Sequence, residues 1–193
     1  RWFGCYGADT VATPHVDQLA ADGCRFTNMF SACAICSPSR AAIATGRYCQ
    51  ANGVIFLTNT VNNNRLHRDE RHLARLLKEQ HGYHTALFGV QHECAHEHVS
   101  EIMAVDERFN TDPWPQADVT ADAVCAWLPA RRGARLPFYA QIGFHEAHLG
   151  RFHSGVPCDH YPWTTDEQRG LAQPPYLTDS AGTHASVSVL QGL

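Results

Sequence analysis

Apolar side chains recur along much of the chain at the spacing of helices or strands. At 71–80, the residues Leu73, Leu76 and Leu77 lie three and four positions apart among charged neighbours, which predicts an amphipathic helix. Gly82 follows and would end that helix in the left-handed conformation.

Three further helices are predicted at 13–23, 37–46 and 118–128. In the second, Ser37 would act as the N-terminal cap and Pro38 would take the first helical position, where its missing N–H costs nothing.

Strands are predicted at 24–30, 83–89 and 138–144. The last is nearly all apolar, which is typical of a strand covered on both faces. The polar, Asn-rich stretch 50–70 and the Pro-interrupted stretch 149–193 predict loops. Because helices and strands alternate, the expected fold class is α/β with a mainly parallel sheet sandwiched by helices.

The amino-acid composition excludes several classes of protein. The chain has 193 residues, of which 44% are hydrophobic and 18% charged, enough to bury a core and too apolar for disorder. A net charge of −4 argues against nucleic acid as a partner. No run of apolar residues reaches the ~20 that a membrane span needs. The 13 His and 8 Cys favour chemistry over a scaffold, although a chain with this apolar content needs no disulfide framework.

The segment 33–40 carries the densest chemical signal. Cys36 would lie at the N-terminus of a helix, where free N–H groups and the helix dipole attract anions. Arg40 adds a fork-shaped positive charge, so a tetrahedral oxyanion could bind beside Cys36. Taken alone, these residues slightly favour ordinary structural cysteines over anion chemistry. A redox pair with Cys33 or half of a zinc site fits less well, because Pro38 lies beyond both cysteines and no second Cys pair follows.

The run CSPSRAAIATGR at 36–47 resembles the signature of the formylglycine-dependent (type I) sulfatases. Other segments resemble the same family in the same order: 4–7 with 13–20, 76–86, and 138–148. The resemblance implies an alkaline-phosphatase-like fold, of which residues 1–193 would be an incomplete N-terminal portion. Within it, 1–148 would be the core that bears the motifs and 149–193 a loop-rich segment.

The resemblance also implies roles for single residues. Cys36 would be converted to formylglycine, whose hydrate attacks sulfur, and Arg40 would hold it and offset charge. His92 matches the His of the family's G-K-x-H motif. Val90 stands where that motif has Lys, so one positive charge expected near the sulfate is missing.

Two further histidines follow the strand at 138–144. By the resemblance, His145 would contact the sulfate and act as an acid on the leaving group, and His148 would line the substrate pocket. Judged by spacing alone, such a pair more often decorates a loop. The His-rich run 92–98 could likewise bind a transition metal, but a solvated loop with His92 as its one functional member fits better.

The family also uses one divalent cation, Ca²⁺ or Mg²⁺, held by oxygen ligands. Of its ligands only Cys36, as formylglycine, falls within the chain. The others are expected before Arg1 and beyond Leu193, so the chain alone is expected to be inactive.

The predicted activity is hydrolysis of a sulfuric ester or sulfamate on a sulfated carbohydrate, with a formylglycine-generating enzyme as partner. Residues 50–53, 144–146 and 174–177 resemble the sulfamidase branch. The parent protein would be periplasmic, lysosomal or secreted. Two alternatives stay open: a phosphonate monoester or phosphodiester hydrolase of the same fold, and a non-catalytic homologue that binds sulfated sugars.

Overall fold

The computed structural model describes residues 3–9, 11–58, 64–67, 69–111 and 115–144. The chain divides into two compact units, one formed by 1–29 with 149–193 and the other by 30–148. The predicted loops of 149–193 lie outside the described residues, and the boundary drawn at residue 148 stays a prediction.

The first unit holds a short 3-10 helix, η1 (Gly4–Tyr6), and the helix α1 (Pro14–Asp22), which confirms the helix predicted at 13–23. Asp17 links the two, because its carboxylate accepts hydrogen bonds from the Cys5 N–H at 2.6 Å and from the Thr13 hydroxyl at 3.1 Å.

The strand predicted at 24–30 is wrong. These residues form no strand and all seven are exposed, including Phe26 and Phe30. Apolar side chains alone do not make a strand. A strand also needs a neighbour for its backbone hydrogen bonds, and none of the described segments pairs with 24–30.

The second unit is built on three parallel strands: β1 (His84–Gly89), β2 (Glu107–Phe109) and β3 (Phe138–Gly143). Their order is β2-β1-β3, with both neighbours parallel to β1. The predicted α/β class and parallel sheet are therefore confirmed. The three-residue strand β2 was not predicted, since it is too short to show a period.

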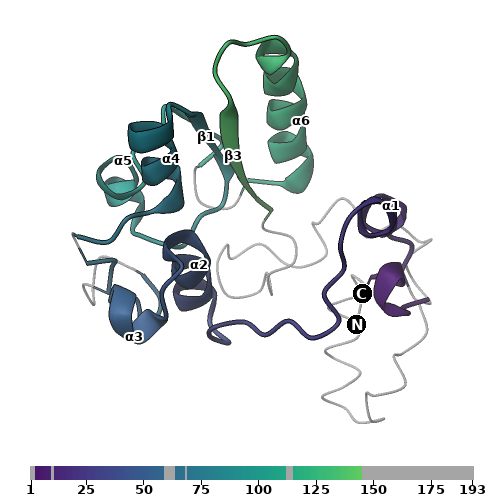
Figure 1. Ribbon diagram of the computed structural model, residues 1–193, viewed down its shortest axis with the longest axis horizontal. Coiled ribbons are helices and arrows are strands. Elements are labelled where there is room, and N and C mark those ends of the chain that lie inside the picture. Colours follow the sequence, from purple (N-terminus) through teal and green to yellow (C-terminus); the bar gives the residue numbers. More distant parts are fainter. Residues whose placement is uncertain (1–2, 10, 59–63, 68, 112–114, 145–193) are drawn as a thin grey trace. The chain divides into compact units, whose positions relative to one another are not determined.

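Helices cover both faces of β1 (Figure 1). On one side lies α6 (Ala117–Trp127), followed by η3 (Leu128–Arg131); on the other lie α4 (Leu73–His81) and α5 (Val99–Ile102). Side chains alternate along β1 accordingly: Phe88 packs with Val124 and Trp127, whereas Leu87 packs with Val99 and Met103. The helices predicted at 71–80 and 118–128 are confirmed.

The strand β3 is less covered than predicted. Phe138 is 41% exposed and Ile142 42% exposed, while β1 is buried from Thr85 to Gly89. Among the described strands, β3 pairs on one side only, so burial falls on the central strand β1 instead.

The helix α2 (Cys36–Thr45) ends at Gly46 as predicted, but Ser37 is not its cap. The helix begins at Cys36 after Ile35, and both Ser37 and Pro38 are buried within its first turn. The Ser37 hydroxyl is used elsewhere, as acceptor for the N–H of Thr58 at 3.2 Å. A short helix, α3 (Cys49–Asn52), interrupts the predicted loop 50–70.

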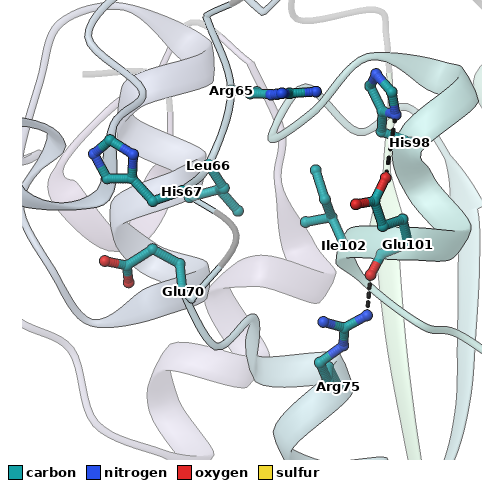
Figure 2. A pocket seen from close by; sticks show the side chains of 8 residues that line it. All are labelled: Arg65, Leu66, His67, Glu70, Arg75, His98, Glu101 and Ile102. Atoms are coloured by element: carbon teal, nitrogen blue, oxygen red, sulfur yellow. Dashed lines mark hydrogen bonds and ion pairs between the residues drawn. The ribbon is translucent and has the colours of Figure 1, made fainter.

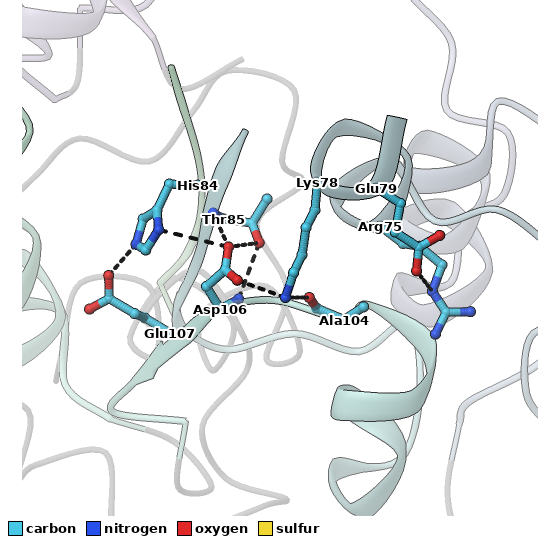
Figure 3. A network of polar contacts seen from close by, with 8 residues as sticks. All are labelled: Arg75, Lys78, Glu79, His84, Thr85, Ala104, Asp106 and Glu107. Carbon is cyan, nitrogen blue, oxygen red and sulfur yellow. Dashed lines mark hydrogen bonds and ion pairs between the residues drawn. The ribbon is translucent and has the colours of Figure 1, made fainter. Parts of the chain in front are cut away.

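A polar network ties the amino end of β1 to its neighbours (Figure 3). Asp106 accepts hydrogen bonds from the N–H and hydroxyl of Thr85 and forms an ion pair with Lys78 of α4 at 2.7 Å. His84 contacts both Asp106 and Glu107. Burial alone would raise the pKa of Asp106, but the hydrogen bonds from Lys78 and Thr85 outweigh it and lower that pKa. This network fixes the amino end of β1, opposite to the carboxyl end that leads to His92.

No helix in the described part of the chain has both the length and the apolar character to cross a membrane.

Candidate functional site

Two of the predicted site residues meet at the carboxyl end of β1. His92 lies three residues after Gly89, the last residue of that strand, and its Nδ1 is 3.5 Å from the Sγ of Cys36. Parallel α/β sheets bind their ligands at the carboxyl ends of the strands. The structure thus brings the predicted nucleophile and a proton-carrying ring together where a ligand is expected.

The N-terminus of α2 makes this place attractive to an anion. Cys36 is the first residue of the ten-residue helix and is partly accessible. The helix dipole places positive potential there, and Arg40 lies on the same face, four residues on. The predicted placement of Cys36 and Arg40 at a helix start holds, although Arg40 falls in the second turn because the helix begins at Cys36, two residues before the predicted first helical residue Pro38.

Thr58 connects the two halves of the site. Its hydroxyl donates to the carbonyl oxygen of His92 at 3.1 Å, and its N–H donates to the hydroxyl of Ser37 at 3.2 Å. The loop that carries His92 is therefore tied directly to the residue that follows Cys36.

Glu93 is buried beside the site. One carboxylate oxygen accepts the N–H of His92 at 2.9 Å, and the other accepts the Gln141 amide of β3 at 2.7 Å. Burial raises the pKa of Glu93, while hydrogen bonds and the positive charge of Arg40 act in the opposite direction. Burial and the nearby charge of Glu93 also raise the pKa of Tyr139.

Two glycines let the ends of β1 and β3 approach closely. The N–H of Val90 donates to the carbonyl oxygen of Gly143 at 2.9 Å. A Cβ on Gly89 would lie 2.2 Å from that oxygen, and one on Gly143 would lie 1.8 Å from the carbonyl oxygen of Val90. Only glycine fits either place, so the path of the chain toward His92 depends on both.

The run 92–98 is more tightly packed than a solvated loop. Glu93 and Cys94 are buried, and His96–His98 forms the 3-10 helix η2. Burial, with the charges of Glu93 and Glu97, raises the pKa of Cys94 to about 12, which disfavours a thiolate ligand.

A small pocket of about 80 Å³, which does not include Cys36, lies between the segments 64–67 and 69–70 and the helices α4 and α5 (Figure 2). Its lining residues are Arg65, Leu66, His67, Glu70, Arg75, His98, Glu101 and Ile102. Several of these charges are already paired: Glu70 with Arg47 at 3.0 Å, and His98 with Glu101 at 3.5 Å. Arg75 donates to the carbonyl oxygen of Glu101.

The described residues do not by themselves supply a complete site for the divalent cation that the resemblance implies. Nowhere among them do three His, Cys, Asp or Glu side chains converge closely enough to hold a metal ion. Calcium and magnesium need several oxygen ligands, and position 36 alone cannot supply them.

The site combines predicted and unpredicted residues. Cys36 and His92 are in contact, and Arg40 lies in the turn after Cys36, whereas His145 and His148 lie outside the described residues. Sequence reasoning missed Thr58, Glu93 and Gln141. A signal existed for Gln141, which is the one amide in the apolar stretch 138–144.

Comparison with known proteins agrees with the fold and the site described above, which are a parallel α/β domain and a helix N-terminus that attracts anions. Residues 2–166 match the family model described as Sulfatase. The chain therefore belongs to the sulfatase family. It is 44% identical over 96 residues to the steryl-sulfatase of Homo sapiens, an alignment covering 46% of this chain and 16% of that protein. It is 35% identical over 136 residues to the ulvan-active sulfatase of Formosa agariphila, covering 70% of this chain and 25% of that protein.

A solved structure from Bacteroides fragilis, described as a sulfatase, superposes with a TM-score of 0.70 at 20% identity. It covers 98% of this chain and 51% of the solved one, and this likeness shows the fold. The chain thus spans about half the length of that structure, and its alignments cover a quarter or less of these two curated relatives.

Proposed function

We propose that the protein containing this chain hydrolyses sulfuric esters or sulfamates, with Cys36 converted to formylglycine as the nucleophile. The observation that carries the proposal is the 3.5 Å approach of the His92 ring to the side chain of residue 36. That approach occurs at the N-terminus of α2, within a chain of the sulfatase family.

Formylglycine, once formed and hydrated, supplies a hydroxyl that attacks sulfur and a second hydroxyl that allows sulfate to leave as the aldehyde returns. The described residues have matching tasks. His92 lies within reach of residue 36 through Nδ1 and can hold or accept a proton there. Arg40 and the helix dipole stabilise the negative charge of the sulfate.

His145 and His148 follow β3 in sequence, and β3 itself pairs with β1 up to Gly143. We propose His145 as the sulfate-binding acid for the leaving group and His148 as a residue of the substrate pocket. Both assignments rest on the resemblance, since neither residue is among those described.

We also propose that the activity requires a divalent cation, Ca²⁺ or Mg²⁺. Formylglycine at position 36 would be one ligand, and the other oxygen ligands would come from outside the described residues. A formylglycine-generating enzyme would be the partner that modifies Cys36.

A sulfated carbohydrate is the proposed substrate class. It is supported by the ulvan-active sulfatase and by the N-acetylglucosamine-6-O-sulfatase of Bacteroides thetaiotaomicron, 38% identical over 88 residues. The steryl-sulfatase shows that other alcohols also occur among relatives, and a sulfamate substrate rests on the sequence resemblance alone. We propose a periplasmic, lysosomal or secreted location for the parent protein.

The test is to co-express the complete protein with a formylglycine-generating enzyme and to measure the mass of the peptide that contains Cys36. We expect the aldehyde form in the wild type and in C125S, which removes an exposed cysteine, and no conversion in C36A. Turnover is then compared on matched aryl sulfate and aryl phosphodiester substrates. An unmodified thiol, or a preference for the phosphodiester, would contradict the proposal.

A further inference from the structure

Glu93 is an ionisable residue in a buried position, which is uncommon. Its side chain is buried, with the residue only 3% exposed, one position after His92. A buried carboxylate loses its hydration and is costly unless hydrogen bonds and an opposite charge replace it. The function proposed above gives Glu93 no task, so its presence needs another explanation.

The hydrogen bonds around Glu93 fix the loop that carries His92. The two carboxylate oxygens accept the N–H of His92 at 2.9 Å and the amide of Gln141 at 2.7 Å. On the backbone side, the Gln91 side-chain oxygen accepts the N–H of Glu93 at 3.0 Å and that of Cys94 at 3.2 Å. Residues 92–94 are therefore held from both sides.

These hydrogen bonds do not by themselves require a negative charge. A glutamine at position 93 could accept the His92 N–H and donate to an acceptor at position 141, at a lower cost of burial. Gln141 would then have to turn its own oxygen toward position 93 and away from the Tyr139 hydroxyl, which donates to that oxygen at 3.2 Å. A carboxylate accepts from both donors at once, and hydrogen bonds to an ionised group are roughly twice as strong as neutral ones.

We propose that Glu93 is a positioning residue of the Cys36 site: it fixes the backbone of His92. His92 is thereby kept beside residue 36. This inference rests on the proposed function, because it assigns Glu93 to the same reaction.

The test uses the complete protein, converted at Cys36, with an aryl sulfate as substrate. In E93Q we expect kcat to fall about 10- to 100-fold, since small displacements of catalytic groups have effects of this size. We expect KM to stay constant, because Arg40 and the helix N-terminus, which we propose to bind the sulfate, are unchanged. A matched control is E70Q, which neutralises another buried carboxylate, paired with Arg47 at 3.0 Å; its kcat should equal that of the wild type.

A second variant separates positioning from mere support of the fold. In the exchange E93Q/Q141E, the introduced glutamine can accept the His92 N–H and donate to the introduced glutamate. Both hydrogen bonds therefore return, with the carboxylate on β3. We expect kcat and the thermal midpoint to recover together, because the His92 N–H is held again. A recovered midpoint with kcat still low, or an unchanged kcat in E93Q with a lower midpoint, would show that Glu93 only supports the fold.

The two proposals can fail separately. If the wild type hydrolyses the sulfate ester and E93Q does so equally well, the assignment of Glu93 is wrong and the proposed function stands. If the wild type is neither converted at Cys36 nor active, both are wrong.

Discussion

The Nδ1 of His92 lies 3.5 Å from the Sγ of Cys36, although 56 residues of chain separate the two. The approach depends on β1, which delivers His92 to the carboxyl end of the sheet, and on Thr58, which ties the backbone of His92 to Ser37. The fold in this way brings together two reactive side chains that lie in separate sequence motifs.

The first prediction concerns that contact. H92A should lower kcat on an aryl sulfate about 10²- to 10⁴-fold, the usual contribution of a positioned proton carrier. Conversion of Cys36 to formylglycine should persist, because the sequence 36–40 is unchanged. The measurements are steady-state kinetics and the mass of the Cys36 peptide. H81A, which removes an exposed histidine at the end of α4, is the control and should keep wild-type kcat. Equal losses in the two variants would rule out a specific role for His92.

The second prediction concerns the backbone that leads to His92. Gly89 and Gly46 have the same φ of +67°, but a Cβ on Gly89 would meet the Gly143 oxygen at 2.2 Å, whereas nothing lies within 4 Å of one on Gly46. G46A should therefore cost only about 1 kcal/mol of unfolding free energy for the left-handed conformation. G89A should cost at least about 3 kcal/mol, because the clash adds to it. Denaturant unfolding measures both, and similar losses would show that the strand ends can separate at little cost.

The third prediction concerns acid stability. His72 is fully buried and caps α4, since its Nδ1 accepts the N–H of Ala74 at 3.1 Å. Its Nε2 has no hydrogen-bond partner in the part of the chain that the structure describes. Burial, with the charge of Arg75, lowers the pKa of His72 from 6.5 to about 4.

Because the folded pKa is lower, the unfolded chain binds the proton more readily. The contribution of His72 to stability is complete above pH 6.5 and is lost as the pH falls from 6.5 toward 4. The loss amounts to about 3 kcal/mol at the low end. In H72N, asparagine keeps a capping oxygen but does not titrate, so unfolding free energy should depend less on pH over this window. An unchanged pH dependence in H72N would assign the effect to other groups.

The elements that could be predicted from the sequence are those with several apolar residues at regular spacing and a residue that ends the element. The helix α4 has three leucines at helical spacing and Gly82 behind it, and β1 contains the apolar run 86–88 with Gly89 behind it, so local pattern and final fold agree. The segment 24–30 is as apolar as a strand, but a strand exists only when a distant segment pairs with it. Local sequence carries no such information.

The residues of the site also fall into two groups, those that the sequence reveals and those that only the fold reveals. Cys36, Arg40 and His92 could be found because they belong to short runs whose residue types suggest chemistry. Glu93 and Thr58 could not, because their importance comes from contacts that cross the fold: Glu93 with Gln141 of β3, and Thr58 with Ser37. A glutamate in a His-rich run looks like a solvated residue until the fold shows that it is buried.

The last prediction concerns Val90, which stands where the family motif has lysine. The residue is partly buried and directly follows β1, two positions before His92. V90K would add a positive charge at the end of the sheet where we propose that sulfate binds. One such charge should lower KM for an aryl sulfate about 5-fold, equivalent to roughly 1 kcal/mol. V90M has a similar length without the charge and is the control. Because the effect is electrostatic, it should shrink as the salt concentration rises. A KM for V90K equal to that for V90M at low salt would show that position 90 does not face the sulfate in this chain, and that Arg40 with the helix N-terminus carries its binding.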